Sequence, residues 1–354
     1  MHKFHHFLAT LSLVSLFLPA CMAAAPDCTL EEVFCAGLVT NLDQLNDKAF
    51  NQSAWEGLQQ ARSDGIVDWI DYIETTDGRD YRKNIKTFAE LGYDVIITVG
   101  EVMSDSTLEA AASHADTYFI GLDQYQTWAA DTDSSNDQGN LAGLIFPEDR
   151  AGFLAGALAG LMTETGKIGA VCASDAFPTI WRYGEGFRSG ALYIDPGLDV
   201  QVVYHTDASA DLTFNDPEWG ASMATGMVDG GVDIIFGVGG ETGKGSIVEA
   251  ATRGAYAIGA DTDQYLQEPV AAPKLLSSAV KAITPAVVEL LQIIREAQKG
   301  STAFPAGNTY GEADLAPFHD LDASVPDEVK VRLEEISLML VSGNIQTGVP
   351  AEKP

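Results

Sequence analysis

Basic residues are scarce in this chain of 354 residues. Only 20 Lys and Arg stand against 51 Asp and Glu, which gives a formal net charge of −31 at pH 7. Binding to nucleic acid or to an anionic membrane surface depends on clustered Lys and Arg side chains near phosphate. The composition therefore argues against a nucleic-acid partner and against a polybasic membrane patch. Strong acidity favours solubility and suits a saline or acidic habitat.

Long apolar runs are also missing. The apolar run near the start, residues 8–18, is far shorter than the roughly 20 residues that a transmembrane helix needs, and it is typical of a secretory signal. Leu18-Pro19-Ala20-Cys21 resembles the lipobox of bacterial lipoproteins, in which the Cys is lipidated. We expect a signal peptide at 1–20, a lipid-anchored linker at 21–35, and an exported protein on the outer side of the cytoplasmic membrane or in the periplasm. A competing cut within 22–25 would discard Cys21 and release the protein.

Cysteine and histidine are too few and too dispersed for most metal chemistry. His114, His205 and His319, the histidines beyond the predicted signal, lack the spacing of a zinc site. Residues 238–245 depart from the P-loop pattern, and residues 131–136 lack the Gly of a calcium loop. We therefore predict no metal, no cofactor and no catalytic residue.

The cysteines that follow the signal have two readings. In an oxidising compartment Cys28 and Cys35 can form a disulfide, and Cys35 can equally be a small core residue in an apolar strand. Both possibilities stay open. For Cys172, inside another apolar run, we favour the core residue.

Short apolar runs alternate with amphipathic segments along the chain, which indicates parallel sheets with right-handed crossovers. Strands are expected at 33–39, 66–73, 94–99, 117–122 and 141–146, and in a second series at 167–172, 200–204, 232–238 and 255–259. Helices are expected at 54–62, 81–91, 106–114, 150–163, 179–193, 219–229, 243–253 and 327–340. The predicted fold class is α/β, with two Rossmann-like lobes, a hinge, and a ligand cleft between the lobes.

Polar, aromatic and glycine residues gather where these strands end. The segments are 40–53, 121–124, 214–217, 238–245, 259–264 and 277–281. Each alone is compatible with ordinary turn or helix-cap chemistry. Together they supply two aromatic rings, which can hold a flat ring, and carboxylates, which accept hydrogen bonds from neighbouring hydroxyls. The pattern therefore predicts a ligand shaped like a nucleoside.

The run Asn46-Asp47-Lys48-Ala49-Phe50-Asn51-Gln52-Ser53-Ala54-Trp55-Glu56-Gly57 resembles the basic membrane protein (BMP) family of substrate-binding lipoproteins, which includes purine nucleoside receptors of ABC importers. Segments 146–169, 214–217, 238–245, 258–264 and 277–281 resemble the same family in order, so that the resemblance covers about residues 35–300. It implies the type 1 periplasmic-binding-protein fold, an ABC permease as partner, and no catalysis. We expect lobe 1 to comprise 36–148 plus 262–300, and lobe 2 to comprise 149–261 plus 301–345.

The resemblance also implies which residues contact the base of the ligand. Phe50 matches the aromatic ring that stacks on one face of the base, and Phe214 resembles the ring on the opposite face. Asn51 matches a contact to the edge of the base. Asn41 stands where the family usually has Asp, which leaves the base preference open, and Asp43 does not replace that residue.

The sugar side of the ligand is implied in the same way. Asp123 and Asp261 resemble the acceptors of the ribose hydroxyls, and Lys281 resembles the donor beside them. Gly240 lies in the loop that closes over the ligand.

We therefore expect an exported solute-binding protein that captures a nucleoside and delivers it to an ABC permease. One alternative is the same fold binding a flavin or another small molecule between the same aromatic rings. An alternative of another class is an extracellular nucleoside-processing enzyme, although the sequence contains no run of aspartates suited to a divalent metal. A receptor that feeds a sensor is disfavoured, because no transmembrane or signalling segment follows.

Overall fold

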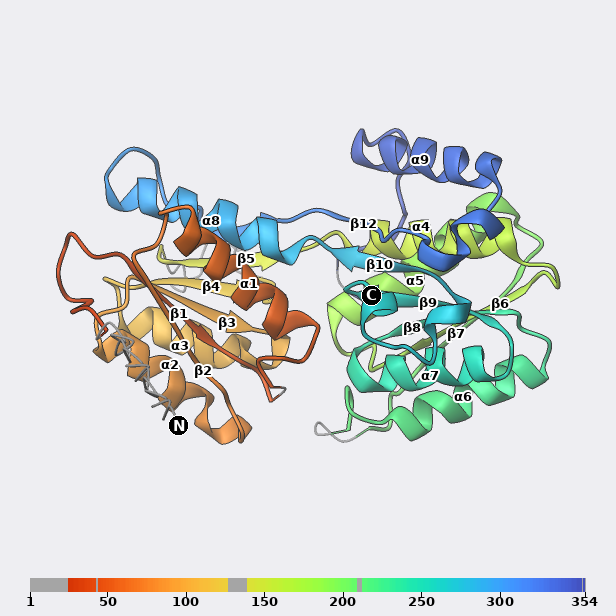
Figure 1. The fold of residues 1–354 in the computed structure, drawn as a ribbon, viewed down its shortest axis with the longest axis horizontal. Helices are drawn as coiled ribbons and strands as arrows, with labels where there is room; N and C mark the ends of the chain where they lie inside the picture. Colours follow the sequence, from red (N-terminus) through yellow and green to blue (C-terminus); the bar gives the residue numbers. More distant parts are fainter. Residues whose placement is uncertain (1–24, 43, 127–138, 209–211, 352, 354) are drawn as a thin grey trace, which may run out of the picture.

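A computed structural model describes residues 25–42, 44–126, 139–208, 212–351 and 353. The predicted signal peptide, Cys21, Asp43 and the acidic segment 131–136 lie outside these residues. The described chain forms two lobes side by side, each a sheet covered by helices (Figure 1). Among the described helices, none combines the length and apolar character needed to cross a membrane.

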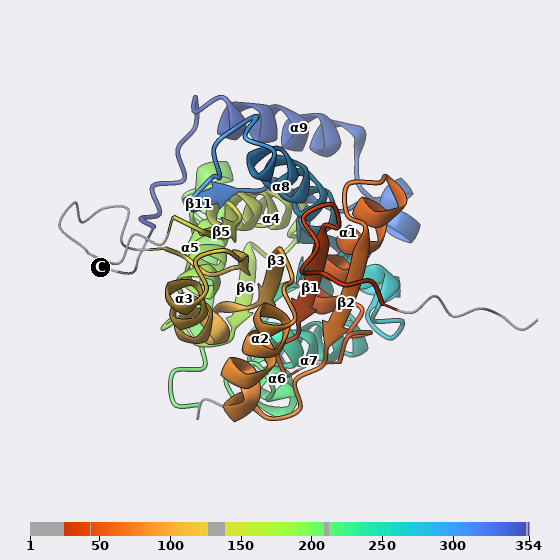
Figure 2. The same cartoon turned by 90° about the vertical axis from the view of Figure 1, so that its left-hand side faces the viewer.

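Lobe 1 is built on a parallel sheet. Its strands, in spatial order, are β11 (Gly307–Tyr310), β5 (Leu141–Ile145), β4 (Tyr118–Leu122), β3 (Val95–Val99), β1 (Cys35–Val39) and β2 (Trp69–Ile73). One face packs against α1 (Phe50–Ser63) and α8 (Ile283–Gln298) around Leu58 and Val287; the other packs against α2 (Tyr81–Glu90) and α3 (Ser104–Ser113). Figure 2 shows α2 and α3 on the side away from α8. Strands buried on both faces explain the continuous apolar runs in the sequence.

Lobe 2 repeats this plan with one antiparallel edge strand. Its strands are β12 (Ala313–Leu315), β10 (Leu275–Lys281), β9 (Tyr256–Asp261), β8 (Ile234–Val238), β6 (Lys167–Cys172) and β7 (Asp199–Tyr204). Its helices are α4 (Glu148–Met162), α5 (Pro178–Ile194), α6 (Pro217–Asp229), α7 (Gly240–Thr252) and α9 (Asp327–Val341). Helices α4 and α5 approach so closely that a Cβ atom on Gly156 would lie 1.9 Å from the carbonyl oxygen of Phe187. The predicted α/β class is confirmed.

The boundaries predicted between the lobes need correction after residue 261. We expected residues 262–300 in lobe 1 and 301–345 in lobe 2. Instead, β10 pairs with β9 in the sheet of lobe 2, and β11 pairs with β5 in the sheet of lobe 1. Three segments of the described chain therefore cross between the lobes, at 145–148, 281–283 and 310–313. β10 thus joins the sheet of the strand that precedes it in the chain, whereas β11 joins its sheet through pairing with a strand far away in the sequence.

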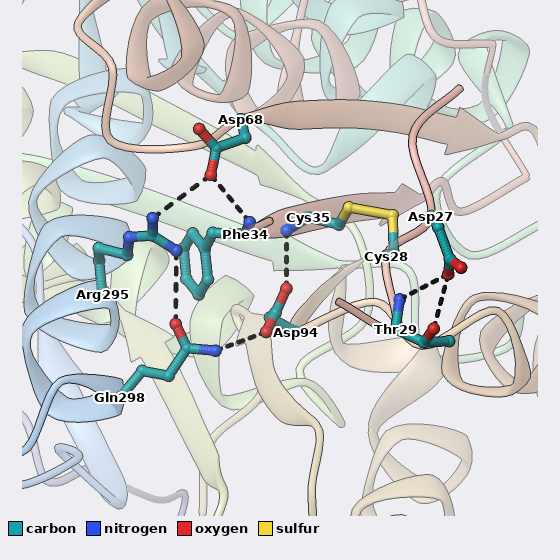
Figure 3. Close-up of a disulfide and its surroundings, with 9 residues drawn as sticks. All are labelled: Asp27, Cys28, Thr29, Phe34, Cys35, Asp68, Asp94, Arg295 and Gln298. Carbon is teal, nitrogen blue, oxygen red and sulfur yellow. Dashed lines mark hydrogen bonds and ion pairs between the residues drawn. A yellow bond between two sulfur atoms is a disulfide. The ribbon is translucent and has the colours of Figure 1, made fainter. Parts of the chain in front are cut away.

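A disulfide fastens the start of the described chain to lobe 1. It joins Cys28 to Cys35, at the beginning of β1 (Figure 3). The backbone N–H of Cys35 donates to Asp94 Oδ2 at 2.7 Å, and Gln298 Nε2 of α8 donates to the other oxygen of Asp94 at 2.6 Å. Cys172 is a free, buried thiol in β6, and burial raises its pKa.

Candidate ligand-binding site

Three of the predicted site residues lie at the carboxyl ends of parallel strands, where open α/β sheets bind ligands. Asp123 directly follows β4, while Asp261 and Lys281 are the last residues of β9 and β10. Asp123 has φ +55° and Asp261 has φ +68°, a left-handed conformation that is uncommon for residues other than Gly. Such backbone strain concentrates at functional sites. The two carboxylates are therefore set by strained turns in lobe 1 and lobe 2.

Lys281 lies at the centre of a cluster of charged side chains that come from both lobes. Its Nζ atom donates to Asp123 and lies 3.2 Å from Asp261 Oδ1 and 3.4 Å from Glu148 Oε1. The side chain is 1% exposed. Burial opposes its charge, but Asp123, Asp261 and Glu148 hold the pKa of Lys281 well above its usual value. Lys281 therefore stays a cation.

Aromatic rings surround the same ammonium group. Lys281 Nζ lies 5.2 Å from the ring centroid of Phe50, 5.4 Å from that of Tyr183 and 5.8 Å from that of Phe146. These distances are within the range of cation–π attraction. Phe50 comes from lobe 1 and Lys281 from lobe 2, so the predicted stacking ring and the predicted sugar-side donor do meet in space.

Asp123 keeps one acceptor atom without a partner. Its Oδ2 atom accepts from Lys281, whereas its Oδ1 atom is buried and has no hydrogen-bond partner among the described residues. Burial raises the pKa of Asp123, Lys281 opposes that rise, and Glu148 and Asp261 add to it. A buried acceptor that lacks a donor is costly. A ligand hydroxyl would satisfy it.

Glu101 is a further carboxylate between the lobes. It follows β3 in lobe 1, and its Oε2 atom accepts a hydrogen bond from Thr179 Oγ1 of α5 in lobe 2, at 3.4 Å. Burial, and then the neighbouring Asp123, raise the pKa of Glu101 to about 8. Lys281 acts in the opposite direction. Glu101 therefore shares the electrostatic environment of the Asp123–Lys281 pair.

The two predicted base-edge residues contact each other. Asn51 Nδ2 donates to Asn41 Oδ1 at 2.8 Å, and the backbone N–H of Asn41 lies 3.4 Å from Asn51 Oδ1. Asn51 is fully buried near the start of α1, where Asp47 accepts from its backbone N–H at 2.9 Å. The Asp47 carboxylate thus orients the first turn of α1, and with it Phe50.

Gly240 and Phe214 are also neighbours. Gly239 and Gly240 have φ values of +96° and +58°, and a Cβ atom on Gly240 would lie 2.6 Å from the carbonyl oxygen of Phe214. That carbonyl accepts from the backbone N–H of Thr242 at 3.3 Å. The ring of Phe214 packs edge-on against Phe177, with 4.9 Å between centroids. Glycine is therefore required where the Phe214 loop meets the start of α7.

Electrostatic interactions also link the base-side loops of the two lobes. Burial raises the pKa of Asp47, and the charge of Lys244 in α7 acts to lower it. A residue of the loop before Phe50 in lobe 1 and a residue of α7 in lobe 2 therefore interact electrostatically. This agrees with a site assembled from both lobes.

Three charged residues of this site are not among those predicted from the sequence: Glu101, Glu148 and Arg182. Glu148 is fully buried and lies 3.0 Å from Arg182 Nη1, and Arg182 Nη2 donates to Asp149 at 2.6 Å. Glu148 follows β5 closely, so the strand-end rule that selected Asp123 could also have selected it. Arg182 lies inside α5, where nothing in the local sequence separates it from a surface arginine.

The model of a protein family described as "ABC transporter substrate-binding protein PnrA-like" matches residues 36–310. The chain belongs to this family. The resemblance to BMP proteins seen in the sequence is thereby confirmed. Solute-binding proteins of ABC transporters are extracytoplasmic, and the relatives named below are called binding proteins, membrane proteins or antigens.

Curated relatives cover much of the chain. The CD4+ T-cell-stimulating antigen of Listeria monocytogenes is 29% identical over 341 residues, which are 91% of this chain and 89% of the relative. The ABC transporter nucleoside-binding protein BmpA of Lactococcus lactis is 27% identical over 65% of this chain and 64% of its own length. Basic membrane protein A of Borreliella burgdorferi is 28% identical over 63% of this chain and 62% of its own.

Solved structures support the fold. A solute-binding protein of an ABC transporter system from Aeropyrum pernix K1 superposes with a TM-score of 0.69 at 21% identity, covering 88% of this chain and 92% of that one. A second, from Conexibacter woesei, has the same TM-score and identity and covers 91% of this chain and all of its own. The chain therefore has the two-lobed fold of type 1 periplasmic binding proteins.

Proposed function

We propose that this solute-binding protein captures a nucleoside between its lobes and delivers it to an ABC permease. The observation that carries the proposal is the buried Oδ1 atom of Asp123, an acceptor without a donor beside the cationic Lys281. The two neighbouring hydroxyls of a ribose can donate hydrogen bonds to such an acceptor, and they can also accept from an ammonium group. The relative from Lactococcus lactis that is named as nucleoside-binding supports the same ligand class.

In the proposed complex the sugar lies at the strand ends and the base lies towards α1. Asp123 and Asp261 accept from the ribose hydroxyls, and Lys281 donates to one of them. The base stacks on Phe50, with Phe214 on its other face. Asn41 and Asn51 read the edge of the base, and the Gly240 loop closes over the ligand.

Binding on this scheme draws the lobes together. Phe50 and Asp123 belong to lobe 1, whereas Phe214, Asp261 and Lys281 belong to lobe 2. A ligand held by both sets contacts the closed form more fully than the open form, and hinge closure is the common response in two-lobed binding proteins. The closed, loaded form is the one that we expect a permease to recognise.

Native mass spectrometry of gently purified protein tests the ligand class, because it shows the mass that co-purifies. Calorimetry with adenosine, inosine, guanosine, cytidine and riboflavin then ranks the ligands. We expect nucleoside binding and a smaller radius of gyration with ligand. Riboflavin binding without nucleoside binding would overturn the nucleoside assignment, and an unchanged radius with demonstrated binding would overturn closure.

We further propose that the mature protein is anchored through Cys21. A triacylated cysteine holds a protein at a membrane firmly, whereas one acyl chain holds it only marginally. Labelling with radioactive palmitate in a bacterial host tests this. The native chain should carry label, and Cys21→Ser should not. An unlabelled native chain that begins within residues 22–26 would show that the competing cut prevails.

A further inference from the structure

Glu148 occupies an unusual position for a carboxylate. It is the first residue of α4 and is fully buried, and only Phe146 and Pro147 separate it from the end of β5. It therefore lies in the first of the segments that cross between the lobes. The helix N-terminus partly offsets its charge, but a buried carboxylate also needs direct partners.

Both partners of Glu148 are cations of lobe 2. Its carboxylate lies 3.4 Å from Lys281 Nζ and 3.0 Å from Arg182 Nη1. Neither oxygen of Glu148 forms a hydrogen bond of normal geometry within the described part of the chain. Glu148 thus holds the two cations by charge, without directional bonds. By contrast, Arg182 is fixed to Asp149 by a hydrogen bond of 2.6 Å.

Lys281 lies in the second crossing segment. It ends β10, and only Ala282 separates it from α8 of lobe 1. Backbone hydrogen bonds join the crossing segments to one another: Gly311 N–H donates to Ile145 at 2.8 Å, and Ala282 N–H donates to Glu312 at 2.9 Å. The Glu148–Lys281 ion pair therefore connects two hinge segments at the point where Lys281 also faces Asp123.

We propose that Glu148 is a positioning residue that couples Lys281 to the hinge. Glu148 does not touch the ligand. Its negative charge attracts the ammonium group of Lys281 in addition to the attraction from Asp123 in lobe 1 and Asp261 in lobe 2. Lys281 is thereby held in the position from which it donates to the sugar. When the lobes rotate, the crossing segments move Glu148 and thereby shift Lys281. This inference rests on the proposed function, since it assigns Lys281 to the ribose side of a nucleoside.

The test compares two ligands that differ only where Lys281 is proposed to act. Glu148→Gln keeps the shape of the side chain and removes its charge. We expect its affinity for adenosine to fall about three- to thirtyfold, the range found for residues that act through a connecting network. Its affinity for 2′,3′-dideoxyadenosine, measured by competition if weak, should change by less than about twofold. Calorimetry gives both values.

A matched control lies on α5, one turn from Arg182. Glu185 accepts from Tyr204 Oη at 3.0 Å and from Arg188 Nε at 3.1 Å, and it has no ion pair with Lys281. Glu185→Gln should leave the affinities for both ligands near those of the native protein. Thermal unfolding of each variant shows that it is folded. If Glu148→Gln does not fold, Glu148→Asp, which keeps the charge on a shorter side chain, replaces it. Its affinities for adenosine and 2′,3′-dideoxyadenosine are then compared in the same way.

The possible failures are distinct. No binding of any nucleoside by the native protein contradicts the proposed function. Native binding together with equal losses of adenosine and dideoxyadenosine in the Glu148 variant contradicts the positioning role, because a purely structural defect weakens both ligands alike. A ribose-selective loss that appears equally in Glu185→Gln also contradicts it.

Discussion

Lys281 of lobe 2 donates a hydrogen bond to Asp123 of lobe 1, although the two residues are 158 positions apart in the sequence. Counting backbone and side chain together, Lys281 is 6% exposed and Asp123 8% exposed, so the pair is shielded from solvent and from salt. Removing one partner of a buried ion pair leaves the other uncompensated, which is more costly than replacing both. Among the described residues, Asp123 Oδ1 has no donor. The Asp123–Lys281 pair is therefore both a contact between the lobes and part of the proposed ligand site.

Asp123→Ala is predicted to impair recognition of the sugar. The lost charge-assisted hydrogen bond should weaken the binding of ribonucleosides by about 1.5–3 kcal/mol. The binding of 2′,3′-dideoxynucleosides should weaken far less, since they lack the hydroxyls that Asp123 would accept from. Calorimetric titration of both ligand types checks this. Equal losses would mean that Asp123 does not read the sugar.

Asn41→Asp is predicted to change the preferred base. An Asn side chain can both accept and donate, which suits adenine or cytosine, whereas a carboxylate only accepts and suits the N1–H of guanine or hypoxanthine. Asn51 Nδ2 donates to Asn41 Oδ1, and an Asp side chain can accept the same bond, so that the surroundings should persist. A buried donor of Asn41 that faces a donor of guanine should weaken binding by about 1–3 kcal/mol. We therefore expect the native protein to favour adenosine or cytidine over guanosine.

The same substitution should shift the preference towards guanosine and inosine. Titration of both forms with adenosine, cytidine, inosine and guanosine measures the ranking. The proposal that Asn41 selects the base is wrong if guanosine binds the native protein tightest, or if the ranking of the four nucleosides is the same in both forms.

Glu101 is predicted to make the protein less stable as the pH rises. Burial and Asp123 raise the pKa of Glu101 from 4.5 to about 8 in the folded state. Between these values the folded state holds a proton that the unfolded state has lost, so the free energy of unfolding falls as the pH rises from about 4.5 to 8. The raised pKa of Asp123 acts in the same direction.

Glu101→Gln should flatten this pH dependence. Urea unfolding at pH 5 and pH 8 measures it, and the difference between the two should shrink by at least about 1.4 kcal/mol, the equivalent of one pKa unit. Glu109→Gln is the control, since Glu109 is exposed and pairs with Arg82 at the surface. An unaltered slope in the Glu101 variant would show that Glu101 titrates normally in the folded protein.

The Cys28–Cys35 disulfide is predicted to stabilise lobe 1. The residues it joins are 7 apart in the sequence, and closing so short a loop in the unfolded chain contributes about 2–3 kcal/mol. Reduction with dithiothreitol should lower the free energy of unfolding by this amount. In the variant with both residues replaced by Ala, the reductant should have no effect, because Cys172 is a free thiol. A response in that variant would point to another cause.

Local sequence patterns suffice to predict the α/β class and most of the helices and strands. The segment predicted as a strand at 117–122 is β4, and the helix predicted at 81–91 is α2. These predictions succeed because strands covered on both faces must be continuously apolar, and helices on their surface must be amphipathic. Asp123 and Asp261 were found by the same local logic, since they directly end such strands.

The partners of Lys281 and Glu148 depend on the tertiary structure. The sequence of β10, Leu-Leu-Ser-Ser-Ala-Val-Lys, does not reveal which sheet it joins, and pairing with β9 places it in lobe 2. The partners of Glu148 come from the end of β10 and the N-terminal part of α5, so its own segment of sequence does not show that the carboxylate is buried between two cations. Ion pairs between distant segments depend on how crossing strands bring two sheets together, and that arrangement is a property of the whole chain.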